Sequence, residues 1–182
     1  MRQKRGWQVS SLTGMLLCGL WFSLNARADV NVYITATILA PVCTVTDIRG
    51  SHQTVVDFGT VPVEKVSGVG ERLDKSHTLG MKVSCDGPAP VGKVLKMKIT
   101  PTGGGTMSYS GRTVLGTSLA GLGIDLIHVT STQPSLLLNT WVPAEPTADG
   151  IVGIVALLVS NNVAALKGGG FTSSASLVMD YQ

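Results

Sequence analysis

The sequence predicts an all-β protein, a sandwich of two sheets formed from short strands. Three observations lead to this fold class. Apolar and polar residues alternate over several stretches of strand length. The 182 residues include 22 glycines and 8 prolines, which interrupt the chain at short intervals. No long segment has the apolar spacing of an amphipathic helix. Together these features are typical of a β-sandwich.

The first 28 residues predict a secretory signal peptide, which is removed on export. A positive start (Arg2, Lys4 and Arg5) precedes a largely apolar segment, and Ala26-Arg27-Ala28 fits the small-residue pattern of a cleavage site. A membrane anchor is the alternative, but polar residues interrupt the apolar segment and leave it too short to span a bilayer. A lipoprotein signal at Cys18 fits poorly, because the bulky Leu17 precedes it.

Removal of this segment leaves 154 residues, enough for one domain with one core. Four of the 14 Lys and Arg residues leave with it while all 11 acidic residues stay, so the net charge falls from +3 to about −1. The remaining basic residues are scattered and predict no nucleic-acid surface. Two cysteines remain, Cys43 and Cys85, and in an oxidising compartment we expect them to form a disulfide rather than two free thiols.

The first expected strand, residues 29–38, has a regular two-residue alternation. Its apolar row consists of Val30, Val32, Ile34, Ala36 and Ile38, and the intervening positions are polar. On periodicity alone, this is an ordinary first strand paired within its own domain.

Further strands are expected in chain order. They lie at residues 44–46, 54–61, 79–85, 95–99, 123–129, 136–138, 151–159 and 171–181. The continuous apolar run 151–159 predicts a strand buried on both faces. Residues 62–74 and the polar, glycine-rich stretch 103–118 predict connections, the second of them mobile, and residues 162–166 a helical turn.

The residues give no enzyme signature. Gly87 to Lys93 resembles a phosphate-binding loop, but Val94 replaces the required hydroxyl residue and two prolines remove backbone donors. The three histidines have no metal-ligand spacing. Residues 116–120 only partly match the nucleophile-elbow pattern. We therefore expect no catalytic residue, metal or cofactor.

Both ends of the chain resemble the chaperone–usher pilins, the subunits of bacterial fimbriae, and most closely the minor tip adaptor subunits of P-type and type 1 pili. The resemblance rests on the start Ala28-Asp-Val, on Pro41-Val-Cys43, Val55-Val-Asp-Phe-Gly59, Cys85 and Gly123-Ile-Asp-Leu126, and on the tail from Gly169 to a penultimate tyrosine. Residues 103–121 do not contribute to it.

The resemblance implies an incomplete immunoglobulin-like sandwich: a six-stranded pilin domain, residues 43–182, that lacks its seventh strand. Residues 29–42 would then form a donor-strand extension, whose apolar row from Val30 to Ile38 inserts into a neighbouring subunit. A groove would lie between the strand after Cys43 and the C-terminal strand. The residues of this acceptor and chaperone-binding strand would be Gly169, Phe171, Ala175, Leu177, Met179, Tyr181 and Gln182.

The implied partners are a periplasmic chaperone, an outer-membrane usher and neighbouring pilin or adhesin subunits. The chain would pass through the periplasm to a fimbrium on the cell surface, as a minor or adaptor subunit assembled by donor-strand exchange. A major rod pilin or a terminator of the same system is the first alternative. A glycan-binding tip adhesin fits less well, because it would carry a second domain and no donor strand.

Overall fold

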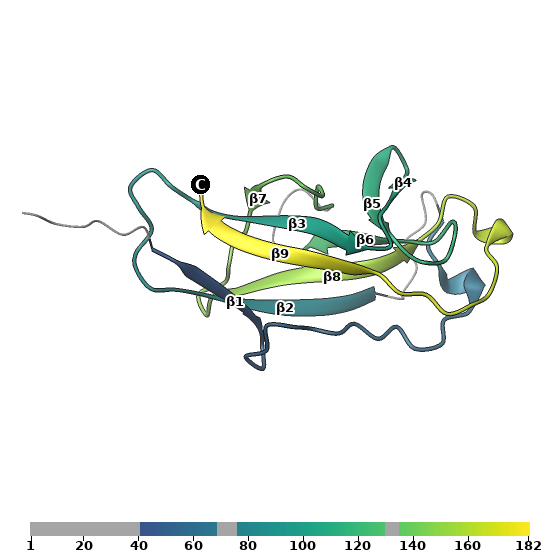
Figure 1. Ribbon diagram of the computed structural model, residues 1–182, viewed down its shortest axis with the longest axis horizontal. Helices are drawn as coiled ribbons and strands as arrows, with labels where there is room; N and C mark the ends of the chain where they lie inside the picture. The colour runs from purple at the N-terminus through teal and green to yellow at the C-terminus, as the bar shows by residue number, and fades with distance from the viewer. Residues whose placement is uncertain (1–40, 69–75, 130–134) are drawn as a thin grey trace, which may run out of the picture. The chain divides into compact units, whose positions relative to one another are not determined.

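The computed structural model describes residues 41–68, 76–129 and 135–182, and this part of the chain forms two antiparallel sheets (Figure 1). The large sheet has six strands in the order β1 (Cys43–Asp47), β2 (Ser76–Cys85), β8 (Ile151–Val159), β6 (Gly123–His128), β5 (Arg112–Gly116) and β4 (Thr106–Tyr109). The small sheet has three, in the order β7 (Val142–Pro143), β3 (Leu95–Gly103) and β9 (Ser174–Tyr181). Two short 3₁₀ helices, η1 (Val63–Lys65) and η2 (Val163–Ala165), lie in connections. The expected all-β sandwich is confirmed, whereas residues 1–40, the expected signal peptide and first strand, lie outside the described residues.

The main core lies between the two sheets. Alternate residues of β8, from Val152 to Leu158, belong to one apolar cluster with Met97 and Ile99 of β3 and Met179 of β9. Met97, Val152 and Leu158 are almost completely buried. The two-residue alternation therefore turns one face of each sheet toward the other, as the sequence predicted for residues 95–99 and 171–181.

A second apolar cluster involves the other row of β8. Leu157 and Val159 pack with Ile127 of β6, Val114 of β5 and Tyr109 of β4. The last four residues of β8 are consequently all buried, which confirms the expectation of a strand buried on both faces.

Residues 103–118 were expected to form a mobile polar connection, and this prediction is wrong. β4 and β5 form a hairpin across them. Ser110 and Gly111 at its tip both have positive φ, 48° and 78°, the backbone that a two-residue type I′ turn requires. Because Tyr109 and Val114 are buried in the second cluster, the hairpin is held by apolar packing despite its polar composition.

Two expected strands are absent from the described residues. In residues 54–61 the Asp57 carboxylate accepts a hydrogen bond from the Gly59 N–H at 2.8 Å, and Gly59 has φ +61°, so the chain turns there. Residues 136–138 cross from one sheet to the other. The Leu136 N–H donates to Leu126 O in β6, and the Asn139 N–H donates to Ile99 O in β3. A segment that bonds to both sheets within four residues cannot run along either.

Candidate strand-acceptor edge

β9 is the edge strand of the small sheet. Its register with β3 runs from Ser174 opposite Gly103 to Tyr181 opposite Leu95. Among the described residues, the opposite edge of β9 pairs with no strand. An unpaired strand edge leaves a row of backbone donors and acceptors available for another strand.

The inner face of β9 carries residues that the resemblance to pilins assigned to the acceptor strand. Leu177, Met179 and Tyr181 lie opposite Ile99, Met97 and Leu95 of β3. Met179 is buried in the main core, whereas Leu177 and Tyr181 are half-buried and Ala175 is exposed. The apolar row along β9 is therefore only partly covered by the described part of the chain.

One edge of the large sheet lies on the same side of the molecule as β9. β1 is its edge strand and contacts β9 (Figure 1). Phe58, in the segment after β1, packs edge-on against His77 of β2 with ring centroids 4.8 Å apart. It also lies 6.1 Å from the ring of Phe171, just before β9. Phe58 and Phe171 both pack on the main core and remain half-buried, so the core approaches solvent where the two sheets end.

Hydrogen bonds fix both ends of β9. At its start, the Ser118 N–H donates to Thr172 O at 2.9 Å, and the Ser173 hydroxyl donates to Gly116 O at 2.6 Å. At its end, Gln182 and Val94 exchange two backbone hydrogen bonds. The open edge is therefore held between two anchored ends.

Two residues of the expected acceptor strand lie at the ends of this segment. Gln182 is exposed, and its side-chain amide donates to the Asp180 carboxylate at 3.0 Å. Gly169 is exposed, and an added Cβ there would meet only Leu119 Cδ1, at 3.6 Å. Packing within the chain therefore does not by itself require glycine at position 169.

Cys43 and Cys85 form the expected disulfide, at directly opposite positions of β1 and β2. One residue earlier, the Val42 N–H donates to Asp86 Oδ1 at 2.7 Å and the Asp86 N–H donates to Val42 O at 3.1 Å. The β1–β2 pairing is thus fixed up to the point where the chain passes to the undescribed residues 1–40. The residues expected to form the donor strand, Val30, Val32, Ile34, Ala36 and Ile38, all lie in that part.

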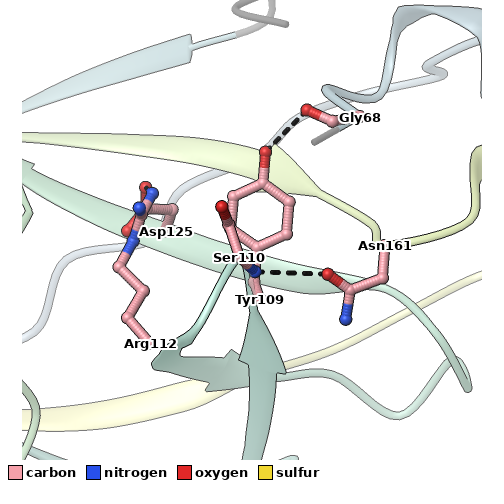
Figure 2. Close-up of polar contacts among 6 residues, drawn as sticks. All are labelled: Gly68, Tyr109, Ser110, Arg112, Asp125 and Asn161. Carbon is pink, nitrogen blue, oxygen red and sulfur yellow. Dashed lines mark hydrogen bonds and ion pairs between the residues drawn. The ribbon is translucent and has the colours of Figure 1, made fainter. Parts of the chain in front are cut away.

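A partly buried polar network, which the sequence analysis missed, holds the β4–β5 hairpin. Figure 2 shows Arg112 directed toward Asp125 of β6, with an Nη2–Oδ2 distance of 2.5 Å, and the Tyr109 hydroxyl donating to Gly68 O at 2.7 Å. The Arg112 guanidinium lies over the Tyr109 ring, 5.2 Å from its centroid. Asp125 is buried, and Arg112 supplies the charged partner that a buried carboxylate requires. Burial raises the pKa of Tyr109, with a smaller lowering effect from Arg112 and a raising effect from Asp125.

The only sequence sign of this network is one acidic residue in the otherwise apolar strand around Asp125. The network shares Tyr109 with the second apolar cluster, and we assign it a structural role.

Within the described ranges, no group of three or more His, Cys, Asp or Glu residues is placed to hold a metal ion. The described helices are also too short to cross a membrane.

A sequence model of the fimbrial protein family matches residues 32–182. The chain belongs to the fimbrial protein family. Its curated relatives include the uncharacterized fimbrial-like protein YfcR of Escherichia coli (strain K12), which is 31% identical over 176 residues, covering 93% of this chain and 92% of the relative.

Solved pilins share the fold of this fimbrial protein. The P pilus adaptor subunit PapF matches with a TM-score of 0.53 and 27% identity, over 80% of this chain and all of PapF. The P pilus rod subunit PapA matches with a TM-score of 0.54 and 16% identity, over 84% of this chain and all of PapA. These matches confirm that the chain is a chaperone–usher pilin with the immunoglobulin-like pilin fold.

Proposed function

We propose that this pilin is a minor adaptor subunit of an adhesive fimbrium, joined to its neighbours by donor-strand exchange. The observation that carries the proposal is the edge of β9. Among the described residues this edge is unpaired, and the half-buried side chains of Leu177 and Phe171 lie beside it. A strand supplied by another chain would bond to this edge and cover these side chains.

In this proposal, a periplasmic chaperone first supplies the missing strand and grips the carboxylate of Gln182 with basic residues. At the outer-membrane usher, the extension of another subunit then replaces the chaperone strand. The pilin in turn donates residues 29–42 to a neighbour. Burial of the four large aliphatic residues and the alanine of its apolar row would contribute up to about 6–12 kcal/mol before ordering costs. This is enough to hold a fibre without covalent links between subunits.

The proposal includes export. Residues 1–28 would direct the chain to the periplasm and then be removed, and the Cys43–Cys85 disulfide would form in that oxidising compartment.

The adaptor role is proposed over the rod role because identity is higher to the adaptor PapF, 27%, than to the rod subunit PapA, 16%. Counting subunits in purified fimbriae by quantitative mass spectrometry tests this part of the proposal. An adaptor is expected in far fewer copies than the rod pilin of the same fibre. Equal or greater abundance would instead assign the chain to the rod.

The acceptor role is tested with two neighbouring residues on opposite faces of β9. Leu177→Asp places a charge among the half-buried apolar residues, whereas Val178→Asp places it on the outward face, where Val178 is 49% exposed. We expect Leu177→Asp to abolish co-purification with the chaperone and incorporation into fibres, and Val178→Asp to retain both. Normal incorporation of Leu177→Asp would contradict the acceptor assignment.

The donor role is tested by deleting residues 29–40 from the mature chain. This variant should remain folded and chaperone-bound, because β1 to β9 are intact, yet fail to join the subunit to which it normally donates. Incorporation at the normal level would refute the donor assignment.

A further inference from the structure

The end of the pilin at which the N-terminal segment leaves the domain carries three exposed apolar residues, Val42, Val91 and Val94, which we call the patch. Their side chains are 67%, 104% and 55% exposed. Single exposed apolar residues are common on protein surfaces, but three around one loop and its adjoining strand require an explanation.

Two of the three valines are held at one end of the molecule by hydrogen bonds of their backbone groups. Val42 bonds to Asp86, at the start of the loop between β2 and β3, and Val94 bonds to Gln182 at the chain's C-terminus. Figure 1 shows this loop, the beginning of β1 and the C-terminus at the same end. The patch is therefore a fixed surface of the domain.

Val91 is presented at the tip of this loop by a tight turn. The Lys93 N–H donates to Pro90 O at 3.0 Å, and Gly92 has φ +76°, the backbone expected at the third position of a type II turn. Val91 thus occupies the second turn position, where the side chain points away from the protein. A turn of this kind does not require an apolar residue at its second position. Neither the turn nor packing within this chain therefore explains why residue 91 is a valine.

We propose that Val42, Val91 and Val94 form a docking surface for the pilin subunit that receives this chain's N-terminal strand. The inference rests on the proposed donor role. The last residue of the apolar row, Ile38, is four positions before Val42, and four residues span at most about 14 Å. A subunit that holds Ile38 in its sheet must therefore have its surface within that distance of the patch. Contact there would extend the strand interface onto the folded domain.

Photo-cross-linking in purified fimbriae tests the location of the patch. One version of the full-length chain carries p-benzoylphenylalanine in place of Thr35, on the polar face of the donor strand, and a second carries it in place of Val91. We expect both probes to capture the same neighbouring pilin, identified by mass spectrometry. If the probe at 35 captures a pilin and the probe at 91 captures none, the docking surface is refuted while the donor role stands. If the probe at 35 captures no pilin, the donor role fails and the docking proposal fails with it.

Capture of the chaperone alone by the probe at 91, in periplasmic extracts and not in fibres, also overturns the proposal. It would assign the patch to the chaperone interface.

The energetic contribution is tested with Val91→Ser, using Val55→Ser as the matched control. Val55 is 89% exposed and also lies in a connecting segment, the one between β1 and η1. Fimbriae containing Val91→Ser should release their subunits about fivefold faster in denaturant, because one apolar side chain loses its buried surface. Val55→Ser should leave the rate unchanged. Equal release rates for Val91→Ser and the wild type would overturn the proposal, provided that both subunits accumulate normally with the chaperone.

Discussion

Removal of the Cys43–Cys85 disulfide should destabilise this pilin strongly. The bond joins residues 42 positions apart, and closing a loop of that length lowers the entropy of the unfolded chain by an amount worth about 4 kcal/mol. Whole domains are stable by only about 5–15 kcal/mol. Because the edge of β9 is unpaired among the described residues, we place the pilin without a supplied strand toward the lower part of that range. Loss of the bond would then remove most of its stability.

The assay is equilibrium unfolding in guanidinium of a mature chain that carries residues 29–40 fused through a flexible linker after Gln182. Supplying the strand within the same chain makes unfolding unimolecular. The double variant Cys43→Ala/Cys85→Ala should lose about 4 kcal/mol of unfolding free energy. Reduction of the wild type should produce the same loss, and reductant should not affect the double variant. In cells, Cys85→Ser should greatly lower the periplasmic yield.

A loss below about 1 kcal/mol would refute this reasoning, because the chain-entropy model gives about 4 kcal/mol for a loop of this length. It would mean that the unfolded chain without the bond keeps enough residual structure that closing the loop removes little entropy. Hydrogen exchange gives an independent measurement on the folded state. If the disulfide is needed, the amides of β1 exchange much faster in the double variant, and if it is not, their protection is unchanged.

Three further predictions concern the described domain. Asp125→Ala should lower the free energy of unfolding, measured by thermal unfolding, by about 3 kcal/mol. This is the lower end of the range for a broken buried pair, because Arg112 is 35% exposed. A change below about 1 kcal/mol would contradict a structural role for the pair. Gly116→Ala should lower the free energy of unfolding by about 2–3 kcal/mol, because the added Cβ would overlap the backbone oxygen of Gly104. Gly168→Ala is the control and should be nearly neutral, because there is open space around that residue. Equal effects of the two substitutions would refute the steric argument. Tyr109 has a pKa raised above its ordinary 10.0, so its contribution to stability is complete below pH 10 and declines as the pH rises through the raised value. Tyr109→Phe should remove this alkaline loss, and an identical pH profile in the variant would show that another group causes it.

The strands that the sequence predicted best are those whose burial is visible in local composition. The run 151–159 is apolar throughout and ends at polar residues, and β8 has these bounds. β9 is evident from its two-residue alternation, although it begins at Ser174, three residues after Phe171. In both strands, neighbouring residues carry the whole signal.

Features that depend on distant residues could not be predicted in the same way. The polar composition of residues 103–118 hides the burial of Tyr109 and Val114, which pack on β6 and β8. A Ser-Gly pair between two short β-forming stretches was the one local sign of the hairpin. The contact between Phe58 and Phe171 joins segments more than a hundred residues apart, and nothing around either residue indicates it.

If this pilin donates and accepts strands as proposed, a pulling force along the fibre enters the domain at Val42. The force would act first on the end of β1, whose five residues pair with β2 from Cys43–Cys85 inward. Without the disulfide, β1 would separate from β2 one pair at a time, beginning at this end. With the disulfide, the covalent bond carries the load directly to β2, which pairs with the central strand β8 along seven residues. The position of the disulfide at the exit of the chain therefore suits a subunit under tension, whereas a bond elsewhere in the same sheet would add stability and leave β1 open to this separation.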